Sequence, residues 1–140
     1  MSEAEWKMLR KLLRYDKGEN RRKHSGHHAD ARMVHKFGAW IGECPKGFHS
    51  KVALELVWDG FPEFRSTTSE HPYRVWNYYD GAIYAARSVD GGVTWHGYPS
   101  GPPADEPPRA ILRQLNARAR EQGEELRLKQ WLKKRWGRKV

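Results

Sequence analysis

A histidine and an arginine in the second half of the chain have side chains suited to phosphodiester chemistry. His96 lies in "VTWHGYP", and histidine titrates near neutral pH, so it can accept or donate a proton. Arg87 precedes it and carries a planar guanidinium that binds phosphate oxygens in a bidentate fork. If the two meet, the histidine would move the proton and the arginine would stabilise the charged phosphorane. Arg87 and His96 are therefore the candidate catalytic residues, with Glu43 or Asp80 as a partner acid only by exclusion.

Two turn signals predict the strands that would bring this pair together. Asp80-Gly81 and the "DGG" at 90–92 separate three runs rich in aromatic and β-branched residues, "YRVWNYY", "AIYAARSV" and "VTWHGY". Asp-Gly readily adopts the positive φ angles that tight hairpin turns require. The pattern predicts a three-stranded antiparallel meander.

The hairpin turns also predict which side chains share a face. A two-residue turn at Asp80-Gly81 pairs Tyr79 with Ala82, and side chains then alternate along each strand. One face, called here the arginine face, carries Arg74, Trp76, Tyr78, Ile83, Ala85, Arg87, Thr94, His96 and Tyr98. The other, called the valine face, carries Val75, Asn77, Tyr79, Ala82, Tyr84, Ala86, Val93 and Trp95.

The valine face can pack as a core, which would leave the arginine face in solvent. Bases stack on aromatic rings and arginine binds phosphate, so Arg74, Trp76, Tyr78 and Tyr98 become candidate nucleic-acid contacts. The opposite assignment stays open. Trp76, Tyr78 and Ile83 could form the core, with His96 hydrogen-bonded beneath a helix.

The segments before the meander are predicted to include a helix that could cover one face of the sheet. Ser2 and Glu5 match a capping box, and apolar residues at helical spacing predict a helix over 3–16. Residues 36–44 favour a strand. "FHSKVALELVWDG" fits either a helix or a strand, and we expect a helix ended by Gly60, followed by a loop over 61–72.

The segments after the meander read as a linker and two helices. Residues 99–108 contain five prolines, which is typical of a stiff, extended linker. Two amphipathic runs follow, split at Gly123. The fold class is therefore α+β: a small antiparallel meander of three to four strands packed on a helix, with flanking basic amphipathic helices at both termini. The expected divisions are 1–36, 37–98, 99–108 and 109–140.

Positive charge is concentrated in the flanks. The net charge of +9 divides into +5 for residues 1–36, −4 for 37–106 and +8 for 107–140. Clustered Lys and Arg attract polyanions and release counterions from phosphates, although solvated helices also use charge for solubility. The flanking residues expected to contact nucleic acid are Arg21, Arg22, Lys23, Lys133, Lys134, Arg135 and Arg138.

Other cofactor and membrane signals are weak. His24, His27, His28 and His35 match no structural zinc spacing, so we expect no metal and no cofactor. The single cysteine, Cys44, excludes an internal disulfide and favours a reducing, cytoplasmic setting. No apolar run is long enough to cross a bilayer, so no membrane partner is expected.

These patterns favour a small basic nucleic-acid-binding protein, with RNA favoured over DNA. A helix followed by an antiparallel meander resembles, in topology alone, small bacterial ribonuclease toxins, which implies a metal-independent ribonuclease as its enzymatic version. The alternative is a protein-interaction module that docks a partner through Trp131 and Trp136 of the C-terminal helix.

Overall fold

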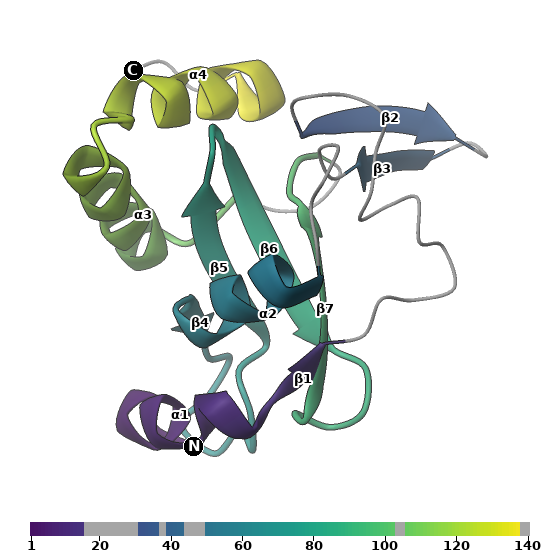
Figure 1. Cartoon of the computed structure of the whole chain (residues 1–140), viewed down its shortest axis with the longest axis vertical. Helices are drawn as coiled ribbons and strands as arrows, with labels where there is room; N and C mark the ends of the chain where they lie inside the picture. The colour runs from purple at the N-terminus through teal and green to yellow at the C-terminus, as the bar shows by residue number, and fades with distance from the viewer. Residues whose placement is uncertain (16–30, 37–38, 44–49, 103–105, 138–140) are drawn as a thin grey trace.

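The computed structural model describes residues 1–15, 31–36, 39–43, 50–102 and 106–137 (Figure 1). Its elements, in chain order, are α1 (Glu3–Leu9), the 3-10 turn η1 (Arg10–Leu12), β1 (Arg14–Tyr15), β2 (Arg32–Lys36), β3 (Ala39–Glu43), α2 (Ser50–Trp58), β4 (Phe61–Glu63), β5 (Arg74–Tyr79), β6 (Ala82–Ser88), β7 (Thr94–Pro99), α3 (Arg109–Glu121) and α4 (Glu125–Trp136).

The fold is α+β, with a five-stranded mixed sheet in the order β1-β7-β6-β5-β4. The central strands β5, β6 and β7 form the predicted antiparallel meander. Tyr79 pairs with Ala82, and Asp80 and Gly81 have φ angles of 42° and 87°, as the Asp-Gly turn predicts. β1 adds a parallel edge strand and β4 an antiparallel one, while β2 and β3 form a separate two-stranded sheet.

Several elements differ from their predicted bounds. The N-terminal helix has its capping box between Ser2 and Glu5, but it ends earlier because the chain turns extended at Leu13 and Arg14 pairs with β7. The ambiguous segment is the helix α2, in which Ala53 and Val57, four residues apart, are buried. β4 occupies the start of the predicted 61–72 loop, and β2 lies almost entirely before the strand predicted over 36–44.

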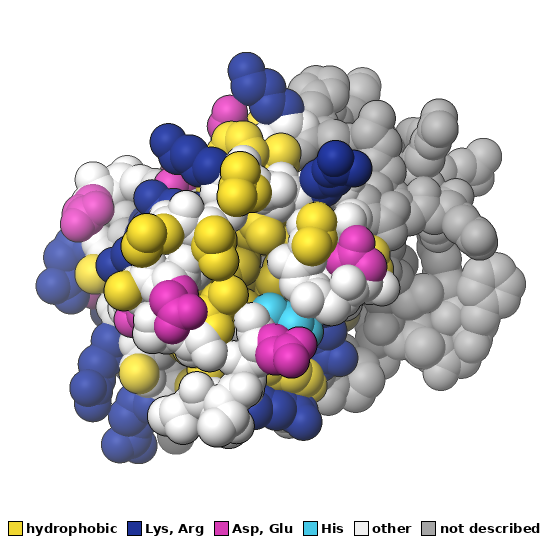
Figure 2. Space-filling view, turned by 90° about the horizontal axis from the view of Figure 1, so that it is seen from below, with side chains coloured by type: hydrophobic (Ala, Val, Ile, Leu, Met, Phe, Trp, Pro, Cys, Tyr) yellow, Lys and Arg dark blue, Asp and Glu magenta, His cyan; other side chains and the backbone are white. Residues whose placement is uncertain are grey.

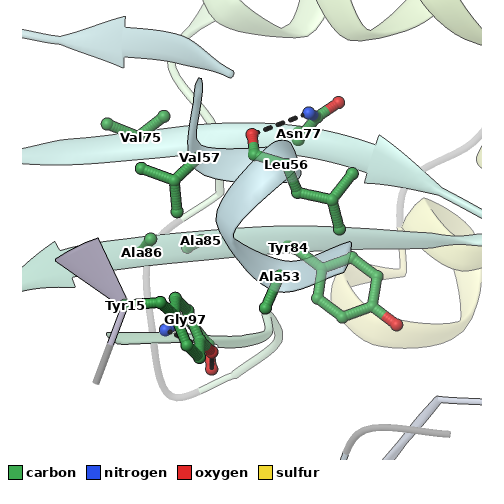
Figure 3. A pocket seen from close by; sticks show the side chains of 10 residues that line it. All are labelled: Tyr15, Ala53, Leu56, Val57, Val75, Asn77, Tyr84, Ala85, Ala86 and Gly97. Carbon is green, nitrogen blue, oxygen red and sulfur yellow. Dashed lines mark hydrogen bonds between the residues drawn. The ribbon is translucent and has the colours of Figure 1, made fainter. Parts of the chain in front are cut away.

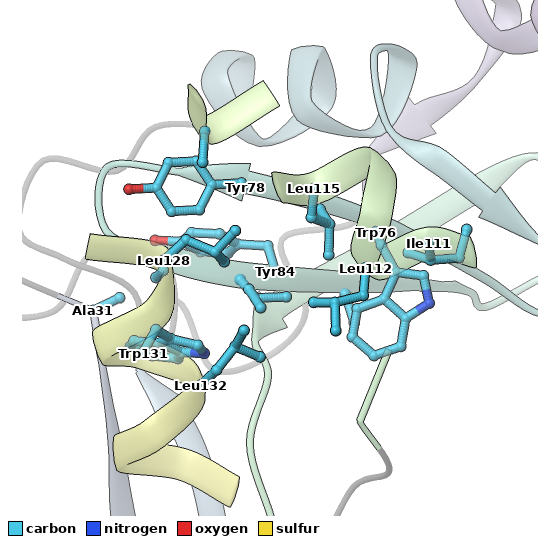
Figure 4. Packing of buried hydrophobic residues seen from close by; sticks show 14 of the residues in the cluster. Ala31, Trp76, Tyr78, Tyr84, Ile111, Leu112, Leu115, Leu128, Trp131 and Leu132 are labelled. Carbon is cyan, nitrogen blue, oxygen red and sulfur yellow. The ribbon is translucent and has the colours of Figure 1, made fainter. Parts of the chain in front are cut away.

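Both faces of the sheet are covered, which corrects the expectation of an open arginine face. On the valine face, Val75, Ala86 and Trp95 pack with Trp6 of α1 and Val57 of α2. On the arginine face, Trp76, Tyr78 and Ile83 pack with leucines of α3 and α4. Figure 4 shows Trp76 and Tyr78 in this cluster. Sheets with helices on both faces bury their central strands on both sides.

The burial of Trp76 and Tyr78 follows from the C-terminal helices. Trp76 is 0% exposed and Tyr78 1% exposed, so neither ring offers a free face to a base. The apolar stripes of α3 and α4 must themselves be buried. Pro99 ends β7 and the chain then returns across the sheet, so that Leu115 and Leu128 cover the aromatic rings.

The C-terminal tryptophans also pack inward. Trp131 is buried and its indole N–H donates to the carbonyl of Ser100 at 3.1 Å. Trp136 is partly buried against the same cluster. These rings therefore stabilise the contact of α4 with the sheet. Trp131 is not exposed, so its ring is not available to dock a partner protein. Within the described part of the chain, no helix has the length and apolar character to cross a bilayer.

Candidate nucleic-acid interface

Arg87 and His96 face each other across β6 and β7, in the register expected from the turns. Directly opposed residues on one face have Cβ atoms about 4.5–5.5 Å apart. Arg87 is exposed and His96 is half-buried. They lie at the end of the sheet where β5 begins and β6 ends, the lower end in Figure 1, whereas α4 crosses the opposite end.

A tyrosine ring gathers arginines at this end. The guanidinium carbon of Arg65 lies 3.6 Å from the centre of the Tyr73 ring, and those of Arg87 and Arg74 lie 4.8 Å and 4.9 Å away. Arg87 Nη2 also donates to the Tyr73 hydroxyl at 2.7 Å. Cations are attracted to the faces of aromatic rings, so Tyr73 holds these side chains together. We call Arg65, Tyr73, Arg74 and Arg87 the arginine–tyrosine cluster.

Only one guanidinium of the cluster is neutralised by a described acid. Arg74 is 4% exposed, and its Nε donates to Glu63 Oε1 at 3.0 Å. Arg65 and Arg87 are exposed, and neither forms an ion pair with a carboxylate of the described residues. The cluster therefore presents two positive charges to solvent.

Some basic residues of α3 and α4 are instead paired with acids. Arg120 pairs with Glu125 at 3.2 Å, and Arg127 pairs with Asp80 at 2.8 Å and with Glu124 at 3.0 Å. Hydrogen bonding to Asp80 is the main factor that raises the pKa of Arg127 above its ordinary value. Of the cations on these helices, Arg120, Arg127 and Lys129 are thus matched by acids of the described residues.

His96 lies between two tyrosines. Its ring is 6.5 Å from that of Tyr15, with an interplanar angle of 22°, and 6.4 Å from that of Tyr98. Tyr98, a predicted base-stacking residue, is half-buried and packs partly against the main core. The Tyr15 hydroxyl bonds the backbone of Gly97 at 3.2 Å and 3.1 Å, which anchors this aromatic group to the sheet edge.

The predicted contact residues are thus divided among several places. Arg87, His96 and Tyr98 share a partly open area, whereas Arg74, Trp76 and Tyr78 are buried. The exposed Lys133 and Lys134 and the half-buried Arg135 lie on α4 at the other end of the sheet. The predictions for Arg21, Arg22, Lys23 and Arg138 fall outside the described residues, as do those for His24, His27 and His28.

Sequence reasoning missed Arg65 and Tyr73. Arg65 belongs to a segment interpreted only as a loop, and Tyr73 was given no role beyond its strand. The alternation of basic and aromatic residues in "FRSTTSEHPYR" was the available signal. Only the pairing of β4 with β5 brings Arg65 back beside the strand that begins after Tyr73.

Figure 2 looks onto this end of the molecule from below. Lys and Arg side chains lie along much of the edge of the described part, hydrophobic side chains occupy much of its middle, and a few acidic side chains lie among them. The exposed hydrophobic residues of α1 and η1 are Met8, Leu9 and Leu12. This end of the molecule therefore combines exposed apolar side chains with cations and a few acids.

A hollow beneath α2 is too small to be a substrate site. Figure 3 shows it between α2 and the valine face, floored by small residues such as Ala85, Ala86 and Gly97. Its volume is about 20 Å³, which suits roughly one water molecule. Asn77 is held at its edge by a 2.9 Å hydrogen bond to the carbonyl of Leu56.

Neither a metal-binding group among the described residues nor a similar known protein gives further evidence of function. Within the described segments, no group of three or more His, Cys, Asp or Glu residues is placed to hold a metal ion. Comparison with protein-family models, curated proteins and solved structures gives no match to the chain. Function is therefore inferred from geometry and charge.

Proposed function

We propose that the protein binds single-stranded RNA through the arginine–tyrosine cluster. The observation that carries this proposal is the pair of exposed guanidiniums, Arg65 and Arg87, which have no acidic partner among the described residues and are held by one tyrosine ring. Two fixed guanidiniums suit two neighbouring phosphates or one bidentate phosphate contact.

The surroundings of the cluster favour a single strand over a duplex. His96 and Tyr98 provide partly open aromatic surface beside Arg87. Unpaired bases can turn outward and stack on such rings, as RNA loops and single strands commonly do. A duplex would offer phosphates but would keep its bases stacked away from these rings.

Neutralising the two exposed arginines is expected to weaken RNA binding and its salt dependence. Each of Arg65→Gln and Arg87→Gln should reduce the slope of log affinity against log salt concentration by about 1, and the double variant by about 2. The reason is that a variant with fewer phosphate contacts releases fewer counterions when it binds. Fluorescence anisotropy of a labelled oligonucleotide across a salt series measures both affinity and slope.

Arg120→Gln is the matched control, since it removes the same charge from a residue already paired with Glu125. It should leave affinity and slope close to wild type. Equal losses in Arg87→Gln and Arg120→Gln would reject the cluster as the binding site. A single-stranded DNA oligonucleotide of the same sequence, bound as tightly as the RNA, would reject RNA as the preferred ligand.

A ribonuclease activity at the same site is a second proposal, favoured by the direct pairing of His96 with Arg87 at a partly open surface. In this reaction the ribose 2′-hydroxyl would attack the phosphorus and the 5′-oxygen would leave, while His96 would transfer a proton and Arg87 would stabilise the negative charge on the phosphoryl oxygens. His96→Gln should then reduce cleavage of labelled RNA in EDTA by about 10²-fold while binding persists. RNA that stays intact with wild-type protein across a broad pH range would end the enzyme proposal and leave the binding proposal standing.

A further inference from the structure

A cationic hollow lies between α4 and the turn that joins β5 to β6. It has a volume of about 260 Å³ and opens to solvent, just below the ~300–1,000 Å³ typical of small-molecule sites. Residues of the turn, of α4 and of the segment before β2 line it: Ala31, Asp80, Gly81, Ala82, Arg127, Gln130, Trp131, Lys134 and Arg135. Figure 4 shows two of them, Ala31 and Trp131, on the same side of the core.

Arg127 forms one wall and is held rigidly. Its Nη1 donates to Asp80 Oδ1 at 2.8 Å and to Glu124 Oε2 at 3.0 Å, and its Nη2 donates to the Asp80 carbonyl at 3.1 Å. Glycine at 81 permits this approach, because a Cβ there would lie 2.5 Å from Arg127 Nη2. A guanidinium has five N–H donors, so Arg127 retains donors beyond these three bonds.

Arg135 supplies a donor that lacks an acceptor. Its guanidinium carbon lies 4.4 Å from the centre of the Trp131 ring, which fixes the orientation of the group. Its Nε is shielded from solvent and has no hydrogen-bond partner. A buried N–H without an acceptor is costly, and burial also lowers the pKa of this arginine. An anion in the hollow that contacts this guanidinium would offset its partly buried charge.

Lys134 adds a further hydrogen-bond donor to the lining of the hollow. Its ammonium is exposed and makes no ion pair with a described carboxylate. The carboxylate in the lining, Asp80, is already engaged by Arg127. The hydrogen-bond donors that remain unused on Arg127, Lys134 and Arg135 therefore all belong to positively charged groups.

We propose that this hollow is a phosphate-binding site, distinct from the arginine–tyrosine cluster, that takes a phosphate group either free or as the ester of a small molecule. Arg135 and Lys134 would donate to the phosphate oxygens, and Arg127, from the same helix, would add its remaining N–H groups. A hollow of this size leaves room for part of an attached organic group.

Titration calorimetry with inorganic phosphate, at constant ionic strength against chloride, tests the site. We expect saturable binding with a dissociation constant on the order of 1 mM or tighter. Lys134→Gln should weaken it about tenfold, because a charge-assisted hydrogen bond is lost. Arg135→Lys should do the same, because lysine keeps the charge but lacks the planar fork of the guanidinium.

Lys133→Gln is the control: it removes the same charge from the neighbouring exposed position of α4, which does not line the hollow. It should bind phosphate within about twofold of wild type, since an exposed charge outside the site is screened. Arg87→Gln should also bind phosphate normally, which separates this site from the proposed RNA surface. Absence of saturation, or equal loss in Lys133→Gln and Lys134→Gln, would overturn the proposal.

Adenosine 5′-monophosphate distinguishes the two sources of the phosphate group. Tighter binding than inorganic phosphate, lost in Lys134→Gln, would identify a phosphate ester as the ligand. Equal affinity would identify free phosphate. Binding of the nucleotide that Lys134→Gln and Arg135→Lys leave unchanged would place it elsewhere and count against the site.

Discussion

Replacement of Trp76 by alanine is expected to destabilise the protein by about 3–5 kcal/mol, which is the range for removing a large buried aromatic side chain. Trp76 is 0% exposed between β5 and α3. Its indole N–H also donates to Glu63 Oε1 at 2.9 Å, so the variant loses both packing and a polar contact. Urea denaturation followed by circular dichroism measures the change.

Trp95→Ala should cost a similar amount, since Trp95 is 0% exposed on the opposite face and packs at 5.3 Å against Trp6. Tyr79→Ala, on the same strand as Trp76 but 36% exposed, should cost clearly less. A Trp76→Ala protein that melts like wild type would mean that the arginine face is open, as the sequence alone suggested, and that α3 does not cover it.

Glu63→Gln is expected to destabilise the protein by about 3 kcal/mol, because it leaves the buried guanidinium of Arg74 without its counter-charge. Gln keeps an acceptor for the indole of Trp76, so the change isolates the ion pair. The side chain of Arg74 is 5% exposed and that of Glu63 17%, which makes water a poor substitute. Chemical denaturation at neutral pH and moderate salt gives the measurement.

Glu125→Gln tests the same type of substitution at the surface. The pair of Arg120 and Glu125 is largely exposed and screened, so its loss should produce little change in stability. A double variant, Glu63→Gln with Arg74→Met, should recover part of the loss because it removes the uncompensated charge. Similar small effects at Glu63 and Glu125 would show that Arg74 is solvated and not buried.

Local chain chemistry determined the meander. Asp80-Gly81 supplies two positive φ angles and sets the pairs of β5 with β6. The turn at 90–92 sets the pairs of β6 with β7, including Arg87 with His96. The capping box at Ser2 and the break at Gly123 are local signals of the same kind. Such features depend on a few adjacent residues, so they can be read without knowledge of the rest of the chain.

Tertiary structure alone decided which surfaces remain open. Alternation assigns side chains to two faces but does not say what covers either face, and here α3 and α4 return to bury Trp76 and Tyr78. The pairing of β4 with β5 brings Arg65 to Tyr73, and the packing of α4 sets Arg127 against the Asp80 turn. The contacts of α3 and α4 join residues far apart in sequence, and their free energy comes from burial and charge pairing that no local pattern contains.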